Sequence, residues 1–323
     1  MHRVDLSIVI PALDEEKSIS ELHLLISKSL DKKKINYEII FVDDGSKDST
    51  WNEIEKIINY NKNVKGIKFK KNYGKSDALD AAFKNSSGDF ILTMDADLQD
   101  DPYEIYKLLE IIKNKKFDLV SGWKKKRNDP LGKTIPSKFF NYVTRVFSGI
   151  HLNDFNCGIK IYRREVIESI DLYGEMHRYI PLIAKWNGYN FIGEKVVNHN
   201  KRKFGKTKFG MERFVRGFLD LLSVSFVYRF KHRPMHFFGS LGVLFFLVGF
   251  VSVGLITYEK ISKISQNIPL DLIRPVTDQP LFYVALVSII IGVQLFLVGF
   301  LSELIIQINS DKKRYKIDKT KNV

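Results

Sequence analysis

Short apolar runs alternate with helix-like patterns along the first part of the chain. The runs have the length and the Ile, Val and Phe content of buried strands, and they occupy residues 6–10, 38–42, 64–69, 90–94 and 117–121. Helical patterns separate them, at residues 16–29, 49–60, 75–85 and 102–113. This alternation predicts an α/β fold, Rossmann-like, with a mostly parallel sheet and helices on both faces.

Polar clusters follow four successive runs at the point where each predicted strand ends. They are Pro11–Glu15, Val42–Ser46, Asn72–Lys75 and Asp95–Gln99. In a sheet of this kind, ligands bind outside the carboxyl ends of the strands, near the point where the strand order reverses. The sequence therefore predicts one binding site that is built from all four clusters.

The last of these clusters carries the clearest chemistry. An extended backbone would place Asp95, Asp97 and Gln99 on one face, because side chains alternate along a strand. Two carboxylates and an amide oxygen are hard ligands that suit Mg²⁺ or Mn²⁺, with substrate phosphates and waters completing the shell. The alternative is an acidic turn that precedes the next helix, with Pro102 in the first turn of that helix.

Two long uncharged stretches lie in the last third of the chain. Residues 237–258 and residues 281–302 each contain 22 positions without a charge, and the apolar pattern continues past Glu303. A helix of that length reaches roughly 33 Å, enough to cross a hydrocarbon core of about 30 Å. The sequence predicts a transmembrane hairpin with spans at about 237–258 and 281–303. A buried core helix is the alternative for each stretch.

Basic residues flank the predicted hairpin on one side. Arg229, Lys231 and Arg233 precede the first span, and residues 312–321 add six Lys or Arg. The connecting loop, 259–280, has three basic residues balanced by three acidic ones. By the positive-inside rule, both termini and the N-terminal domain are expected on the cytoplasmic side of the inner (cytoplasmic) membrane, in a multi-pass arrangement.

The pattern divides the chain into four parts. We expect a cytoplasmic domain at 1–210, an amphipathic interfacial helix region at 211–235, a transmembrane hairpin at 236–308 and a basic cytoplasmic tail at 309–323. A plain packing helix is the alternative for the second part. The single Cys157 and the lack of a signal peptide before residue 6 fit a cytoplasmic location for the first part.

Charge and motif spacing exclude several classes of function. The formal net charge is +14, but the lysines are scattered and no nucleic-acid-binding signature accompanies them. Three Gly-Lys-Ser/Thr triplets occur, yet the glycine that a P-loop requires five positions earlier is Phe69, Arg127 or Asn200. No G-x-G-x-x-G follows a predicted strand, which disfavours a nicotinamide enzyme. A membrane surface or a phosphorylated substrate is the better explanation of the charge.

The polar motifs together resemble those of family 2 glycosyltransferases with the nucleotide-diphosphosugar (type A) fold. Within that family, the chain is similar to membrane-anchored polyprenyl-phosphate glycosyltransferases of the dolichol-phosphate mannose synthase and bactoprenol glucosyltransferase type. The motifs that carry the resemblance are Ile10–Glu15, Val42–Ser46, Asn72–Lys75, Asp95–Pro102, Asp154–Gly158, Met176–Arg178 and the segment from His199 to Phe209.

The resemblance implies a role for individual residues. Asp95, Asp97 and Gln99 would hold the metal, and Asp95, Asp97, Arg202 and Lys208 would act in catalysis. The nucleotide sugar would contact Pro11, Leu13, Glu15, Val42, Asp44, Lys75, Asp95, Ala96, Asp97, Gln99, Arg202 and Lys208. Candidates for binding the acceptor phosphate are Lys124, Arg127, Ser137 and Arg145, with a charged surface loop as the alternative for the lysine run at 124–126.

The implied reaction is a metal-dependent, inverting transfer of one sugar from a UDP- or GDP-hexose to a membrane polyprenyl phosphate, for cell-envelope glycan or lipid modification. The expected partners are the nucleotide sugar, the polyprenyl phosphate and membrane lipids, with no nucleic acid, and a homo-oligomer is compatible with the sequence. Two alternatives stay open. One is a processive polysaccharide synthase, and the other is a catalytically silent nucleotide-sugar-binding scaffold.

Overall fold

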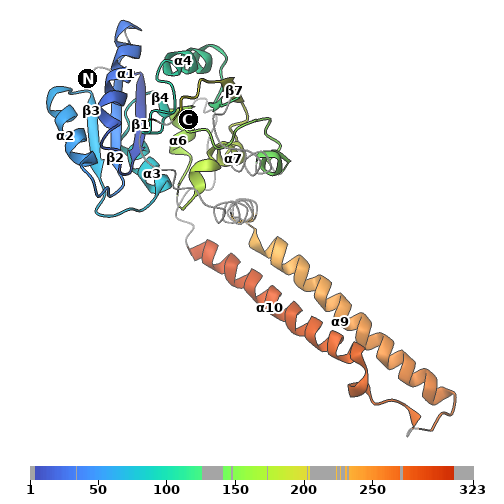
Figure 1. Cartoon of the computed structure of the whole chain (residues 1–323). Coiled ribbons are helices and arrows are strands. Elements are labelled where there is room, and N and C mark those ends of the chain that lie inside the picture. Colours follow the sequence, from blue (N-terminus) through green and yellow to red (C-terminus); the bar gives the residue numbers. More distant parts are fainter. Residues whose placement is uncertain are drawn as a thin grey trace. The chain divides into compact units, whose positions relative to one another are not determined.

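The computed structural model describes residues 4–33, 35–125, 141–146, 148–172, 174–201, 233–269 and 272–308, with the single residues 203, 223, 226 and 230. The chain divides into two compact units, Met1–Val224 and Ser225–Val323 (Figure 1). Most of the predicted interfacial helix at 211–235 and the whole basic tail at 309–323 lie outside the described residues.

The first unit is built on a sheet of seven strands. Their order across the sheet is β3-β2-β1-β4-β6-β5-β7, and all neighbouring pairs are parallel except those that β6 forms with β4 and β5. The strands are β1 (Leu6–Ala12), β2 (Tyr37–Asp43), β3 (Val64–Lys68), β4 (Phe90–Thr93), β5 (Leu119–Trp123), β6 (Lys160–Arg163) and β7 (Ile192–Val196). The predicted mostly parallel sheet is confirmed, and β6 and β7 extend it beyond the runs that the sequence predicted.

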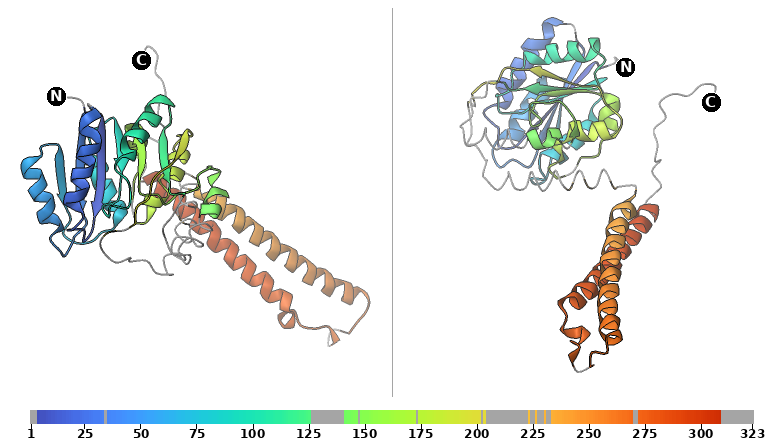
Figure 2. Two further views of the ribbon diagram at one scale, coloured as in Figure 1. Left: turned by 45° about the horizontal axis from the view of Figure 1, so that its top comes forward. Right: turned by 90° about the vertical axis from the view of Figure 1, so that its right-hand side faces the viewer.

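Different helices cover the two faces of the sheet, because side chains alternate along each strand. Leu6, Ile8 and Ile10 of β1 share one apolar core with residues of α1 (Ile19–Leu30), α2 (Thr50–Tyr60) and α4 (Glu104–Asn114). The helix α3 (Lys75–Asn85) packs on β1 and β2, and its buried Ala78 and Ala82 lie outside that core. The expectation of helices on both faces is confirmed (Figure 2).

Shorter elements complete the first unit. They are the helices α6 (Arg164–Glu168) and α7 (Ile180–Trp186) and the 3₁₀ turns η1 (Asp31–Lys33) and η2 (Met176–Arg178). The turn η2 contacts α3, and α7 follows η2 almost directly. This contact brings residues from the second half of the unit next to the amino end of α3.

The carboxyl ends of the central strands meet at one edge of the sheet. Ala12 at the end of β1 is in register with Asp43 at the end of β2, and Val9 is in register with Thr93 at the end of β4. The backbone N–H of Asp44 donates to the carbonyl of Ala12 over 2.9 Å, which continues the pairing past the strands. The polar clusters that follow β1, β2 and β4 are therefore neighbours, as predicted.

The second unit is a hairpin of two long helices. The helices α9 (Pro234–Ser265) and α10 (Pro280–Ile308) lie side by side, with the 3₁₀ turn η4 (Val276–Asp278) between them (Figures 1 and 2). Two glycines allow a close approach of the backbones, because a Cβ on Gly242 would lie 3.0 Å from the carbonyl oxygen of Gly292. Small residues at a helix crossing are typical of membrane-embedded pairs.

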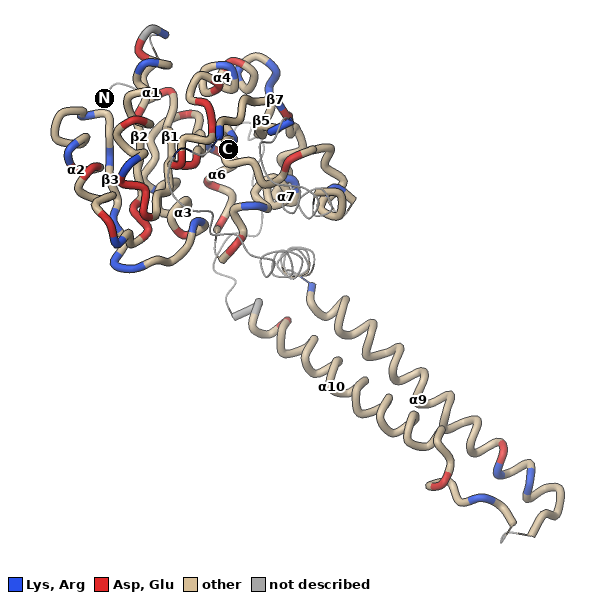
Figure 3. The backbone as a smooth tube through the Cα atoms, in the orientation of Figure 1, with Lys and Arg blue, Asp and Glu red and all other residues tan. Residues whose placement is uncertain are grey.

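Both helices are long and apolar enough to cross a membrane. Mean hydropathy is 2.3 for Pro234–Ser265 and 2.7 for Pro280–Ile305. Charged residues are almost absent along their length (Figure 3), while large apolar side chains such as Phe250 and Leu301 are exposed. The predicted spans at 237–258 and 281–303 both lie inside these helices, and the expectation of an apolar two-helix hairpin is confirmed.

Candidate active site

The acidic cluster after β4 is a turn. The strand ends at Thr93, and the residues that follow it bend at Ala96–Leu98, where Leu98 has a left-handed φ of 61°. The backbone N–H of Gln99 donates to Oδ1 of Asp97 over 3.1 Å. The extended geometry that the sequence suggested for these residues is wrong, because the turn ends the alternation of side chains. The turn nevertheless carries two carboxylates one residue apart.

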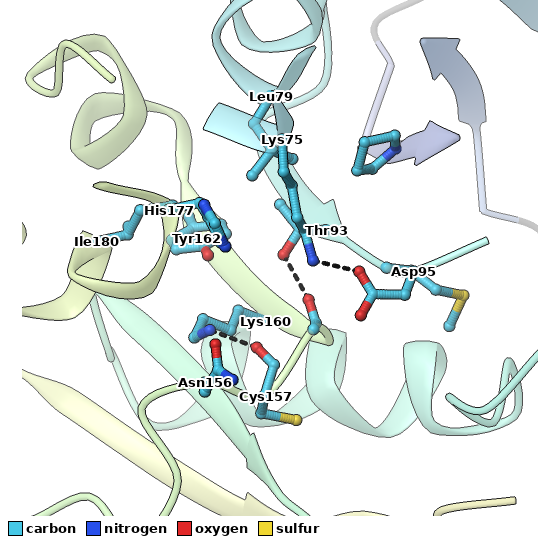
Figure 4. Close-up of a pocket in the computed structure, with 13 residues that line it drawn as sticks. Lys75, Leu79, Thr93, Asp95, Asn156, Cys157, Lys160, Tyr162, His177 and Ile180 are labelled. Carbon is cyan, nitrogen blue, oxygen red and sulfur yellow. Dashed lines mark hydrogen bonds and ion pairs between the residues drawn. The ribbon is translucent and has the colours of Figure 1, made fainter. Parts of the chain in front are cut away.

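A lysine neutralises the first carboxylate of this turn. Lys75 is the first residue of α3, and its ammonium group forms an ion pair with Oδ1 of Asp95 (Figure 4). Burial alone would raise the pKa of Asp95, but the positive charges of Lys75 and Lys124 hold that pKa well below its ordinary value. Asp95 is therefore ionised at neutral pH, with a cation already in contact with it.

These residues fit a divalent metal that keeps several water and phosphate ligands. Asp95 and Asp97 supply carboxyl oxygens, the side chain of Asp95 is 33% exposed, and Gln99 is half-buried beside them. Within the described residues, no group of three or more His, Cys, Asp or Glu side chains could hold an ion. Mg²⁺ and Mn²⁺ need no such cage, since one or two carboxylates with substrate phosphates suffice.

Lys124 lies beneath the same turn. Its side chain is 13% exposed and its ammonium group is 2.8 Å from Oδ1 of Asp100, whose side chain is fully buried. Burial alone would lower the pKa of Lys124, but the Asp100 carboxylate holds it above its ordinary value. Of the other predicted acceptor-phosphate residues, Arg145 donates to the carbonyl of Leu152 over 3.0 Å, and Arg127 and Ser137 lie outside the described residues.

Backbone hydrogen bonds join the cluster after β2 to the cluster after β3. Asp44 is 5% exposed, and its two oxygens accept the backbone N–H groups of Tyr73 over 2.7 Å and Gly74 over 3.0 Å. These bonds fix the loop before α3. Burial raises the pKa of Asp44 above its ordinary value, in opposition to the two hydrogen bonds. Gly45 has a left-handed φ of 73°, and a Cβ there would lie 2.3 Å from the carbonyl carbon of Lys71.

The other predicted nucleotide-sugar residues surround this edge of the sheet. The backbone N–H of Glu15 donates to Oγ1 of Thr50 over 2.8 Å, and the Glu15 carboxylate accepts from the hydroxyl of Ser18. Leu13 is half-buried, whereas the side chains of Val42 and Ala96 are buried inside the fold. Arg202 and Lys208 lie outside the described residues.

A small pocket joins the acidic turn to residues of the second half of the unit (Figure 4). Pro11, Lys75 and Asp95 line one part of it. The remaining lining residues are Leu79, Thr93, Met94, Asn156, Cys157, Gly158, Lys160, Tyr162, His177 and Ile180. The structure therefore brings three of the predicted site residues together and adds residues for which the sequence predicted no role, Lys160 among them.

Close packing sets the shape of this pocket. A Cβ on Gly158 would lie 2.5 Å from Oδ2 of Asp95, so only glycine lets the turn come this near. The hydroxyl of Thr93 donates to the carbonyl of Gly158 over 2.9 Å. His177 is held through Ser76, whose Oγ accepts the His177 backbone N–H over 3.0 Å and lies 3.1 Å from Nδ1 of its ring.

The sheet with its strand-end acidic turn has the architecture of the nucleotide-diphosphosugar (type A) transferase class. Solved structures show the same fold. Mannosyl-3-phosphoglycerate synthase from Rubrobacter xylanophilus superposes with a TM-score of 0.58 at 16% identity, over 71% of this chain and 75% of that one. Glucosyl-3-phosphoglycerate synthase from Mycobacterium tuberculosis, in complex with Mn²⁺, UDP and phosphoglyceric acid, superposes with a TM-score of 0.54 at 18% identity, over 70% and 78%.

Sequence comparison then gives the family. Residues 7–171 match the glycosyl transferase family 2 model. Dodecaprenyl-phosphate galacturonate synthase from Rhizobium johnstonii is 35% identical over 305 residues, 94% of this chain and 88% of that protein. Undecaprenyl-phosphate 4-deoxy-4-formamido-L-arabinose transferase from Shewanella sediminis is 34% identical over 219 residues, which span 67% of this chain and 65% of that protein. The chain belongs to glycosyl transferase family 2 and is a glycosyltransferase.

Proposed function

We propose that this glycosyltransferase moves a single sugar from a nucleotide sugar to a membrane polyprenyl phosphate. The observation that carries the proposal is the match to a dodecaprenyl-phosphate transferase over 94% of the chain. A match of that extent includes the apolar hairpin as well as the sheet. The names of the two relatives share the polyprenyl phosphate but differ in the sugar, one of them an acidic sugar, so the sugar is left open at this step.

The chemistry needs little from the protein beyond positioning and charge. An oxygen of the lipid phosphate forms a bond to the anomeric carbon of the sugar, and the bond from that carbon to the diphosphate oxygen breaks. The electron pair leaves with the nucleoside diphosphate. The phosphate is already anionic near neutral pH, so no general base is required, and in-line displacement inverts the anomeric centre. Proximity and electrostatic stabilisation then supply most of the rate.

The residues of the acidic turn have defined roles in this proposal. Asp95, Asp97 and Gln99 would hold Mg²⁺ or Mn²⁺, and the ion, when bound, stabilises negative charge on the departing diphosphate as a Lewis acid. Lys75 positions Asp95 through its ion pair. Asp44 orders the loop that carries Lys75, and the edge beside it receives the nucleoside. Arg202 and Lys208 are proposed to contact the donor phosphates.

The hairpin is proposed to anchor the enzyme where its acceptor lies. The apolar helices α9 and α10 support a two-span anchor in the inner (cytoplasmic) membrane, and the basic flanks support a cytoplasmic location for the catalytic unit and both termini. In this arrangement a polyprenyl chain and the enzyme share the bilayer. The charged head of the acceptor is then held at the membrane surface.

The test is transfer of label from a donor to lipid. The full chain in detergent is incubated with undecaprenyl phosphate, Mg²⁺ or Mn²⁺, and a panel of radiolabelled UDP- and GDP-sugars. Label in the lipid extract is counted, and the mass of the lipid product is measured by mass spectrometry. A product with one sugar is expected. Products with many sugars would favour a processive synthase. Binding of a donor without any turnover would favour a silent scaffold.

A further inference from the structure

Lys160 is a buried lysine in the middle of the sheet. It opens β6, where it is in register with Thr93 of β4 and with Ser121 of β5, and its exposed fraction is 4%. Its ammonium group donates to the backbone carbonyl of Cys157. Among the residues that the structure describes, no carboxylate forms an ion pair with it. A buried charge without an opposite charge is costly, so this position is unusual for a lysine.

The neighbouring lysines of the site differ from Lys160 in this respect. Lys75 pairs with Asp95, and Lys124 pairs with Asp100. Burial lowers the pKa of Lys160 and the positive charge of Lys75 acts in the same direction, whereas the negative charges of Asp154 and Asp95, which form no ion pair with Lys160, oppose this shift only in part. Among the described residues, the site thus holds two lysines that form ion pairs with carboxylates and one, Lys160, that forms none. An anionic group that entered from outside would meet the charge of Lys160.

The pocket places Lys160 away from the acidic turn. In Figure 4, Lys160 and His177 lie on one side of Lys75, and Asp95 lies on the other. The exposed Asn156 also lines the Lys160 side. If the acidic turn binds the donor diphosphate through a metal, the sugar ring lies at the opening of the pocket and one of its substituents enters the pocket. Lys160 then faces the sugar, at a distance from the diphosphate.

The size of the pocket limits what can reach Lys160. The cavity volume is about 20 Å³, which is room for one small polar group and too little for a sugar ring or a diphosphate. A carboxylate is planar and compact, and its two oxygens accept up to about four hydrogen bonds. It would accept hydrogen bonds from the Lys160 ammonium N–H groups that do not donate to the carbonyl of Cys157.

We propose that Lys160 binds a carboxylate on the donor sugar, so that the substrate class is a nucleotide hexuronate and a neutral nucleotide hexose is a poor substrate. This inference rests on the proposed function, namely transfer from a nucleotide sugar. In a hexuronate the carboxylate is carbon 6, which is attached to carbon 5 and is separated from the reacting anomeric carbon by carbon 5 and the ring oxygen. A neutral hexose would bury a hydroxymethyl group beside Lys160 and leave the lysine charge unmatched.

The experiment compares two pairs of donors that differ only at carbon 6. The full chain in detergent is given UDP-galacturonate or UDP-galactose, and UDP-glucuronate or UDP-glucose, with undecaprenyl phosphate as acceptor. We expect kcat/KM to be at least roughly 100-fold higher for the better uronate than for its neutral partner. Lys160→Met should lower the uronate value roughly 10- to 100-fold, because a hydrogen bond to a charged group is lost, and should leave the neutral value nearly unchanged.

Lys185→Met is the matched control. The Lys185 ammonium also donates to backbone carbonyls, those of Ser148 over 2.9 Å and Gly149 over 3.0 Å, but Lys185 does not line the pocket. This variant should keep the preference for the uronate. Binding of UDP alone, measured by calorimetry, reports whether each variant is folded with an intact nucleotide site, and it should be unchanged in Lys160→Met.

Two outcomes would overturn the inference. Equal use of acidic and neutral donors by the wild type is one. The other is a loss in Lys160→Met that is the same for both donors, which would assign Lys160 to the diphosphate or to the acceptor. If no donor supports transfer, the proposed function fails, and the affinities of the uronate and neutral nucleotide sugars still decide the role of Lys160. Tighter binding of the uronate that disappears in Lys160→Met supports it, and equal affinities refute it.

Discussion

The two parts of the candidate site treat their charged groups differently. At the ends of β1 and β2, the carboxylate of Asp44 is occupied by the backbone N–H groups of Tyr73 and Gly74. At the ends of β4 and β6, charged side chains pair with one another, as Lys75 does with Asp95, or form no ion pair within the described residues, as at Lys160. The charged group of the first part is therefore satisfied by backbone hydrogen bonds, whereas the charged groups of the second part can interact with a ligand.

This difference separates a framework from a reaction centre. Backbone hydrogen bonds to a buried carboxylate order a loop and change little when a substrate binds. A lysine on a carboxylate can be replaced there by a metal ion, and an unmatched buried lysine gains an opposite charge only when a ligand arrives. We therefore expect substitutions at β4 and β6 to change the reaction, and substitutions at the β1–β2 edge to act mainly on loop order and stability.

The largest effect is predicted for the acidic turn. Asp97→Asn should lower the rate of sugar transfer about 100- to 1000-fold, because it removes one negative charge from the proposed metal site. The measurement is the initial rate with a labelled donor at saturating metal. Asp101→Asn is the control, since Asp101 follows the same turn and accepts the backbone N–H of Tyr103 over 3.0 Å, but it is not one of the proposed metal ligands.

Removal of the metal tests the same step without a substitution. Saturating chelator should abolish transfer by the wild type, and added Mg²⁺ or Mn²⁺ should restore it. Full activity in chelator would refute metal dependence. Full activity of Asp97→Asn would refute the role of Asp97 even if the chelator result held.

The next prediction compares how much two buried lysines, Lys124 and Lys160, contribute to the free energy of unfolding. Lys124→Met should lower the free energy of unfolding by about 3–5 kcal/mol, because it leaves the buried Asp100 charge without its partner. Lys160→Met should cost only about 1–3 kcal/mol, since it leaves one backbone carbonyl unsatisfied and removes an unmatched charge. Urea unfolding of the full chain in detergent measures both values.

A double variant controls for the volume of the side chain. Lys124→Met combined with Asp100→Asn should recover part of the loss, because neither charge then remains buried alone. Equal destabilisation by Lys124→Met and Lys160→Met would show that the two lysines are matched to the same degree. That result would also weaken the contrast between Lys160 and the ion-paired Lys124.

Parts of this fold were predictable from the sequence because burial leaves a continuous apolar run. The strands β1, β2 and β4 are buried on both faces, and their sequences are accordingly continuous apolar runs. The hairpin was predictable from the length of its two apolar stretches and their lack of charge. The strand β6 was not predictable in this way, because its four residues, Lys160–Arg163, include a buried lysine and an arginine. A lysine in so short a strand looks like surface, and only the packing around it shows that it is buried.

The acidic turn shows a second limit. Its residue types predicted a site at a strand end, and the structure places them there. Its backbone was not predictable, since Leu98 takes a left-handed φ that leucine rarely adopts and that no neighbouring residue signals. In the same way, the link between Asp44 and the loop before α3 joins residues about 30 positions apart, and only the fold brings them together.

The smallest predicted effect concerns pH at the framework edge. Burial raises the pKa of Asp44 in the folded chain above the value of about 3.9 expected when unfolded. The folded state therefore binds this proton more tightly. Asp44 favours folding most below about pH 4, and that contribution is lost as the pH rises through the folded pKa. The free energy of unfolding of the wild type, relative to that of Asp44→Asn, should fall as the pH rises from about 4 through the folded pKa of Asp44. Urea unfolding of the full chain at several pH values measures the difference. A difference that grows with pH would mean that the hydrogen bonds from the backbone N–H groups of Tyr73 and Gly74 lower the pKa of Asp44 more than burial raises it. The ionised carboxylate of Asp44 would then stabilise this edge of the site.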